Sequence, residues 1–234
     1  MSTLLQSDAL SIPGGSQSAN LSFGSNVTAG SLLSVVLQLS SITMTGLTVV
    51  DTQGNTYQRA LADKVGSNPP VTTSSHWWTV ASTSGACQAQ LAWTGATGGG
   101  LVISEWDVDG TGDIGVIDAD SFEETSNVTA HNSAPAPGLS ADADQVMISG
   151  GIVGGTGIFA AAGSGWTLLE TAGRAGAQYR LPTGTVTDNQ GPWTSDLTRP
   201  ATSFMVVFGR TAAPEPEVFQ YPPVRTRGLN HRLN

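Results

Sequence analysis

The sequence predicts an all-β protein. Short apolar runs alternate with clusters of Gly, Ser, Asn and Pro at intervals of about ten residues, a pattern typical of a sandwich or jelly roll. Helical periodicity is nearly absent. We expect a single β-sandwich or jelly roll at residues 20–210, with an N-terminal segment, 1–19, before it and an extended arm, 211–234, after it.

About ten runs have the length and composition of strands. In the run 101–108 apolar and polar residues alternate, so Glu105 and Trp106 point to opposite faces. The segment 52–55, Thr-Gln-Gly-Asn, is turn chemistry, because Gly and Asn tolerate positive φ. The expected strands are Leu32–Leu39, Leu47–Asp51, Thr56–Leu61, Ser75–Ala81, Ala86–Trp93, Leu101–Val108, Gln145–Val153, Trp166–Thr171, Ala177–Leu181 and Thr202–Gly209.

The composition narrows the classes of partner. The chain has 234 residues, a net charge of −9 and a pI near 4.5, which disfavours nucleic-acid binding because phosphate contacts need clustered Lys or Arg. No stretch approaches the roughly 18 apolar residues of a membrane span, and the N-terminus lacks a secretory signal. We expect a soluble protein made in the cytoplasm. The lone Cys87 excludes an intrachain disulfide and is expected to be a buried small hydrophobe.

The last 24 residues differ from the rest of the chain. They hold four of the twelve prolines, which argue against helix or central strand, and three of the nine basic residues. Several apolar side chains lie among them. We interpret this arm as a segment that contacts a neighbouring subunit, the alternative being a disordered terminus. The candidate partner-binding residues are Phe219, Tyr221, Val224, Arg225, Arg227 and Arg232.

Catalytic motifs are scarce. There is no nucleophile elbow, the single lysine excludes a P-loop, and the three histidines are isolated from one another. A carboxylate pair for glycoside hydrolysis would be formed by Glu105 and Glu170, although polar strand residues facing solvent are far commoner. We therefore predict that the protein is not an enzyme and has no catalytic residues.

The segment 107–118 has the spacing of a calcium-binding loop. Alternating oxygen side chains wrap a hard cation while Gly112 permits the sharp bend. The last ligand position is Asp rather than Glu, and the flanks are predicted strands rather than helices. The hypothesis is a calcium site, the alternative an acidic surface loop, and no other cofactor is expected. The candidate ligands are Asp107, Asp109, Thr111, Asp113 and Asp118.

Six tryptophans raise a glycan-binding hypothesis, because sugars stack on exposed rings. Trp193 lies in a turn-rich segment and is the candidate for an exposed ring, and Trp78 is the second candidate. The alternative is that the tryptophans are core anchors.

The order of motifs resembles a β-sandwich module of bacteriophage virion proteins and some bacterial surface proteins. The resemblance covers about residues 20–210, and the arm lies outside it. It implies a structural or adhesive role without catalysis. The residues that carry it are Asp51, Gly54, Asn55, Tyr57, Trp78, Glu105 and Trp106.

These observations predict a non-enzymatic virion structural protein. The expected role is a capsid-decorating (cement or spike) subunit held by its arm, with a tail-associated position next. Its partners would be major capsid or tail subunits and further copies of itself, as a homo-oligomer for which a trimer is a guess. The alternative is a carbohydrate-binding adhesin or tail receptor-binding module that binds a surface glycan.

Overall fold

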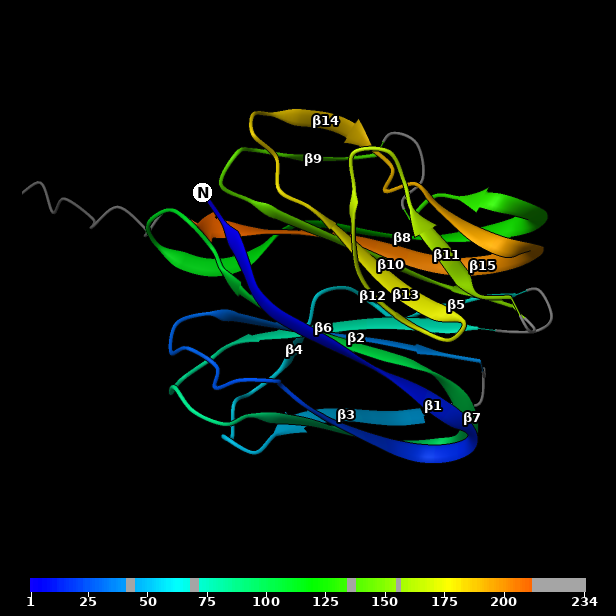
Figure 1. Cartoon of the computed structure of the whole chain (residues 1–234), viewed down its shortest axis with the longest axis horizontal. Helices are drawn as coiled ribbons and strands as arrows, with labels where there is room; N and C mark the ends of the chain where they lie inside the picture. The colour runs from blue at the N-terminus through cyan, green and yellow to red at the C-terminus, as the bar shows by residue number, and fades with distance from the viewer. Residues whose placement is uncertain (41–44, 68–71, 134–137, 155–156, 212–234) are drawn as a thin grey trace, which may run out of the picture.

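The computed structural model describes residues 1–40, 45–67, 72–133, 138–154 and 157–211. These residues form fifteen strands and no helix, which confirms the all-β prediction (Figure 1). Consequently this part of the chain contains no helix able to cross a membrane. The strands are β1 (Thr3–Ser22), β2 (Leu32–Leu39), β3 (Thr45–Asp51), β4 (Gln58–Arg59), β5 (Lys64–Val65), β6 (Thr73–Val80), β7 (Gln88–Asp107), β8 (Asp113–His131), β9 (Leu139–Ala141), β10 (Val146–Val153), β11 (Phe159–Ala162), β12 (Thr167–Ala172), β13 (Ala175–Arg180), β14 (Val186–Asn189) and β15 (Trp193–Thr211).

The first sheet has the order β1-β7-β2-β6-β4 and is antiparallel throughout. The long strand β7 pairs with β1 on one side. On its other side it pairs with β3 through residues 89–94 and with β2 through residues 99–106. The sheet therefore curls into a half-barrel, and the curled end with β3 is visible in Figure 1. The inside of the curl is filled by apolar side chains that include Leu33, Val35, Leu91 and Ile103.

The second sheet packs face to face on the first. Its order is β11-β15-β10-β13-β12, with β8 paired to β15, and its pairings are also antiparallel. The shared core joins Val36 and Trp106 of the first sheet to Ile148, Phe204 and Phe208 of the second. The outer face of the second sheet is covered in part by the small β9–β14 ladder. All eight residues of β2 and all eight of β10 are consequently buried.

Glycines allow close approaches between the two sheets and within the second sheet. A Cβ on Gly100 of β7 would lie 2.6 Å from the Cβ of Ala175 and 2.7 Å from the carbonyl oxygen of Ala172. A Cβ on Gly151 of β10 would lie 2.3 Å from the indole of Trp193. These contacts explain why strands in the centre of the domain carry glycine, which otherwise weakens a strand.

The number of strands exceeds the expected ten. The runs 86–93 and 101–108, predicted as two strands, belong to the single strand β7, because Gly98–Gly100 continue the pairing between them. The segment 1–19, placed outside the domain by the sequence pattern, lies almost entirely in β1 and pairs with β7. β1 is an edge strand with few buried side chains, so it lacks the apolar alternation that identifies a strand.

A neutral histidine lies between the two sheets. The ring of His76 in β6 is completely buried, with centroids 4.8 Å from the Phe204 ring and 5.4 Å from the Phe208 ring. Its Nε2 is hydrogen-bonded to the Ser34 hydroxyl at 2.8 Å, and its Nδ1 has no hydrogen-bond partner in the described residues. Burial lowers the pKa of His76 from 6.5 to about 3.

We expect this histidine to make the fold sensitive to acid. Between about pH 6.5 and pH 3, His76 is protonated in the unfolded chain but stays neutral in the folded chain. The free energy of unfolding should therefore fall in this window by up to about 1.4 kcal/mol per pH unit from this residue alone. Urea unfolding at several pH values should show a shallower slope for His76→Gln, which retains a polar partner for Ser34. Equal slopes for the two proteins would contradict the prediction.

Candidate functional site

The arm lies outside the described residues, but the point where it leaves the domain is defined. The candidate partner-binding residues Phe219, Tyr221, Val224, Arg225, Arg227 and Arg232 all belong to 212–234. The last strand, β15, ends at Thr211, which pairs with Asp113 at the start of β8. The arm therefore begins at the end of the domain that carries the β7–β8 turn.

Arg210 organises this end of the domain. Its Nε donates to the carbonyl of Val108 and its Nη1 to the carbonyl of Gly112, both at 2.8 Å, so the guanidinium fastens the β7–β8 turn to β15. The hydroxyl of Ser2 accepts from the Asp109 N–H at 3.0 Å and donates to the Asp144 carbonyl at 2.5 Å, which links this turn to the β9–β10 turn. The turns are thus held together by contacts between segments distant in sequence.

Carboxylates surround Arg210. Three hollows of about 600, 380 and 330 Å³ share Arg210 in their linings. The aspartates along these hollows come from the end of β7, the β7–β8 turn, the start of β8 and the β9–β10 turn, and all are exposed. We call this surface the acidic end. Its members are Asp107, Asp109, Asp113, Asp142 and Asp144.

The sequence carries a signal for this surface in its distribution of charge rather than in a spaced motif. Residues 105–144 contain ten of the 18 carboxylate side chains, and no Lys or Arg occurs between Lys64 and Arg174. Residues 1–211 carry 16 acidic and 6 basic side chains, for a net charge of −10, whereas 212–234 carry 2 and 3, for +1. The domain and the arm therefore have opposite charge.

The structure does not form the expected calcium loop. Only residues 108–112 make the turn, and Asp113 and Asp118 lie in β8, where they pair with Thr211 and Val207 of β15. Five residues along a strand separate these two aspartates by about 16 Å, too far to share one ion. The described residues contain no group of three or more His, Cys, Asp or Glu side chains that could hold a metal. The calcium-loop pattern of residues 107–118 therefore runs from the end of β7 through the β7–β8 turn into strand β8.

The two glycan-platform candidates are buried. Trp193 is 1% exposed and stacks between Phe159 and His131, with ring centroids 4.6 and 4.3 Å away. Trp78 is 9% exposed and contacts Phe208 edge-on in the core between the sheets. The prediction that Trp193 is exposed was wrong, because the turn-rich segment before it ends at residue 192 and Trp193 opens β15.

Three residues of the resemblance, Asp51, Asn55 and Tyr57, are joined by hydrogen bonds in a turn around the Asp51 carboxylate. Its Oδ1 accepts from the N–H groups of Gln53 and Asn55, and its Oδ2 accepts from the Asn55 amide, the Tyr57 hydroxyl and the Cys87 thiol. The Asn55 side-chain oxygen then accepts from the N–H and hydroxyl of Ser82. Burial, with the Asp51 charge, raises the pKa of Tyr57 above its ordinary value and that of Cys87 to about 12. This motif therefore holds the fold.

The carboxylate pair does not share a groove. Glu105 is 1% exposed, and its oxygens accept from the Thr28 N–H, the Ser31 hydroxyl and the Gln6 amide. Glu170 of β12 accepts from the Ser7 hydroxyl at 3.0 Å. Gln6 and Ser7 are consecutive in β1, so the two carboxylates lie on opposite faces of the first sheet.

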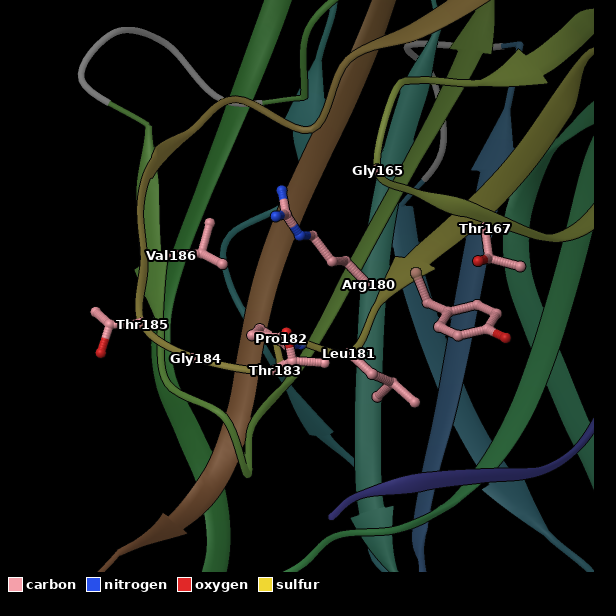
Figure 2. Close-up of a pocket in the computed structure, with 10 residues that line it drawn as sticks. Gly165, Thr167, Arg180, Leu181, Pro182, Thr183, Gly184, Thr185 and Val186 are labelled. Carbon is pink, nitrogen blue, oxygen red and sulfur yellow. The ribbon is translucent and has the colours of Figure 1, made fainter.

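One further hollow lies beside the loop that follows β13. Figure 2 shows Arg180, Thr167 and Val186 around it, together with the loop 181–185. Its volume is about 610 Å³, and Tyr179 also lines it. Hydroxyls, one guanidinium and one aromatic ring are groups that can bind a small polar ligand.

No protein-family model, curated protein or solved structure matches this chain. The functional conclusion therefore depends on the residues and their geometry.

We expect the substitution Asp51→Ala to destabilise the fold strongly. Five donors would lose a buried acceptor, and each unpaired donor costs about 1–3 kcal/mol. Urea unfolding should show a loss of about 3 kcal/mol or more, and a thiol reagent at pH 8 should modify Cys87 faster than in the native protein. Asp142→Ala, which removes an exposed acceptor of one Thr185 bond, is the matched control. Similar stability of the two variants would contradict the prediction.

Proposed function

We propose that the protein is a non-enzymatic virion structural protein, a capsid-decorating subunit that holds neighbouring subunits through its arm, residues 211–234. In this proposal the domain is a β-sandwich module of the kind that the motif order resembles. The observation that carries the proposal is the division of charge. The arm is net positive and leaves a net negative domain at its acidic end.

The use of the polar side chains supports a structural role. Asp51, Glu105 and His76 are buried, and their hydrogen bonds go to groups within the domain. A catalytic group must instead reach a substrate in a hollow. Asp51, Glu105 and His76 therefore stabilise the fold.

The mechanism would be mechanical. An arm of 24 residues spans up to about 75 Å when extended, enough to cross to a second subunit. The arm would become ordered on contact, when burial of Phe219, Tyr221 and Val224 offsets the entropy of ordering. Its arginines would pair with carboxylates of capsid or tail subunits, or of further copies of this chain.

The alternative function is a carbohydrate-binding module, and the hollow in Figure 2 is the observation that favours it. Its volume of about 610 Å³ lies within the usual range for small-ligand sites. In this alternative Arg180 and the loop hydroxyls would bind the sugar, and the buried Trp78 and Trp193 would not.

We expect the full-length protein to co-sediment with undecorated capsids and the truncated protein 1–211 to remain in the supernatant. Truncation after Thr211 keeps β15 whole, so the domain should melt at the same temperature with or without the arm. Arm dependence would be measured by the bound fraction at several salt concentrations, since exposed charge pairs weaken as salt rises.

The variant Arg180→Ala is the matched control for the alternative. Capsid binding should be unaffected by Arg180→Ala if the arm is the anchor. If neither the full-length protein nor the truncation binds capsids, the proposal is overturned. Glycan binding that survives truncation and is lost in Arg180→Ala would establish the alternative.

A further inference from the structure

The strand β8 forms a long open edge of the second sheet. It pairs with β15 on one side, and in the described residues no strand pairs with it on the other. Toward its middle the edge is covered, because Ser67 donates to Glu123 from its N–H and hydroxyl. The stretch from Asp113 to Phe122 remains accessible to a further strand and spans about 33 Å.

Two aspartates accept hydrogen bonds from backbone N–H groups of this edge. The Oδ1 of Asp118 accepts from the Ala119 N–H at 2.9 Å, and the Oδ1 of Asp120 accepts from the Ser121 N–H at 2.7 Å. Alternate residues of β15 form backbone hydrogen bonds with β10 and with β8. By this alternation the backbone groups of residues 118 and 120 face β15, and those of residues 119 and 121 face the open edge. The carboxylates thus stand where the carbonyls of an added strand would bind.

Such capped N–H groups close an edge to unspecific strand addition. The same arrangement occurs on β1, an edge strand of the first sheet, where Asp8 accepts from the Ala9 N–H at 2.8 Å. The edge at 118–121 would open to a segment that provides cations for the two carboxylates and carbonyls for the two freed N–H groups.

We propose that this segment is 224–227, Val-Arg-Thr-Arg, from the arm of a second copy of the chain, added antiparallel to β8. This inference rests on the proposed function of the arm and names its partner surface. Arg225 and Arg227 are two residues apart, as are Asp118 and Asp120, so each pair lies on one face of its strand. Opposite charges directly across a strand pair are favourable.

The prolines fit one register. With Thr226 opposite Ala119 and Val224 opposite Ser121, the carbonyls of these two arm residues accept from the N–H groups that face the edge. Arg225 then lies opposite Asp120 and Arg227 opposite Asp118. Pro223 lies at a position that donates nothing to β8, and Pro222 at one that should donate, so the pairing ends there.

A second copy is favoured over the chain's own β8 by the length of the arm. Thr211 lies at the start of β8, and Asp118 is about 16 Å further along. The 14 residues that follow Thr211, up to Arg225, span about 45 Å when extended, and four prolines among them favour an extended path. The arm is therefore suited to reach past its own domain.

A charge exchange tests the proposal with full-length protein and no capsid. Asp118→Lys/Asp120→Lys leaves a basic arm with a basic edge, and Arg225→Glu/Arg227→Glu leaves an acidic arm with an acidic edge. By sedimentation velocity at low salt, the wild type should self-associate, each variant alone should associate at least about tenfold more weakly, and an equimolar mixture of the two should recover association.

Two further variants keep the test sharp. Asp118→Asn/Asp120→Asn removes the charges but retains acceptors for the two N–H groups, and should weaken association. Asp142→Asn/Asp144→Asn removes the same charge from exposed aspartates of the acidic end and should have little effect. All variants should melt within a few degrees of the wild type, because the substituted side chains lie on an open edge, an exposed turn or the arm.

A wild type that stays monomeric at every concentration, or a mixture that does not recover association, would overturn the proposal. A monomer whose arm protects β8 amide protons at all dilutions would instead place the arm on its own domain. Capsid binding is measured separately. Arm-dependent capsid binding without copy-to-copy association would leave the proposed function standing and refute this inference.

Discussion

Burial of β2 and β10 on both faces is the constraint on which the rest of the structure depends. Each strand lies at the centre of a sheet that is covered on two sides, so neither contributes a solvent-facing row. The half-barrel curl of the first sheet covers one side of β2, and the second sheet covers the other. Gly100, which lies against Ala172 and Ala175 of the second sheet, lets these layers meet.

Polar groups inside such a layered core must find partners within the protein. Ser34 bonds to His76 between the sheets, and the Ser104 hydroxyl accepts from the indole N–H of Trp106. At the rim of the curl, Asp51 collects five donors and Glu105 three. The chain has few charged residues for its length, and several of them form hydrogen bonds that hold turns in place. Its exposed carboxylates gather on the acidic end and along β8.

The sequence predicted elements whose burial produces a simple pattern. The range Leu32–Leu39 agrees with β2 at both ends, because a strand buried on both faces reads as a continuous apolar run. β8 was not predicted because it is an edge strand rich in acidic residues, and its first residues fit a calcium-loop spacing equally well. Trp193 was predicted to be exposed because turn residues precede it, whereas it is the first residue of a strand and is buried. The acidic end could not be derived from spacing, since it joins turns distant in sequence.

In the proposed assembly, the aspartates on the open edges keep the separate protein closed to unspecific strand addition. An uncapped edge of ten residues would add any extended chain, since backbone groups carry no sequence information. The carboxylates bonded to the N–H groups of Ala119 and Ser121 make strand addition there unfavourable unless the incoming chain compensates both charges. Only a cation at every second residue does this at Asp118 and Asp120, and in this chain the segment Arg225–Arg227 has that spacing. Selectivity for the arm would then follow from the cost of displacing the caps, while affinity follows from the ladder that forms once they move.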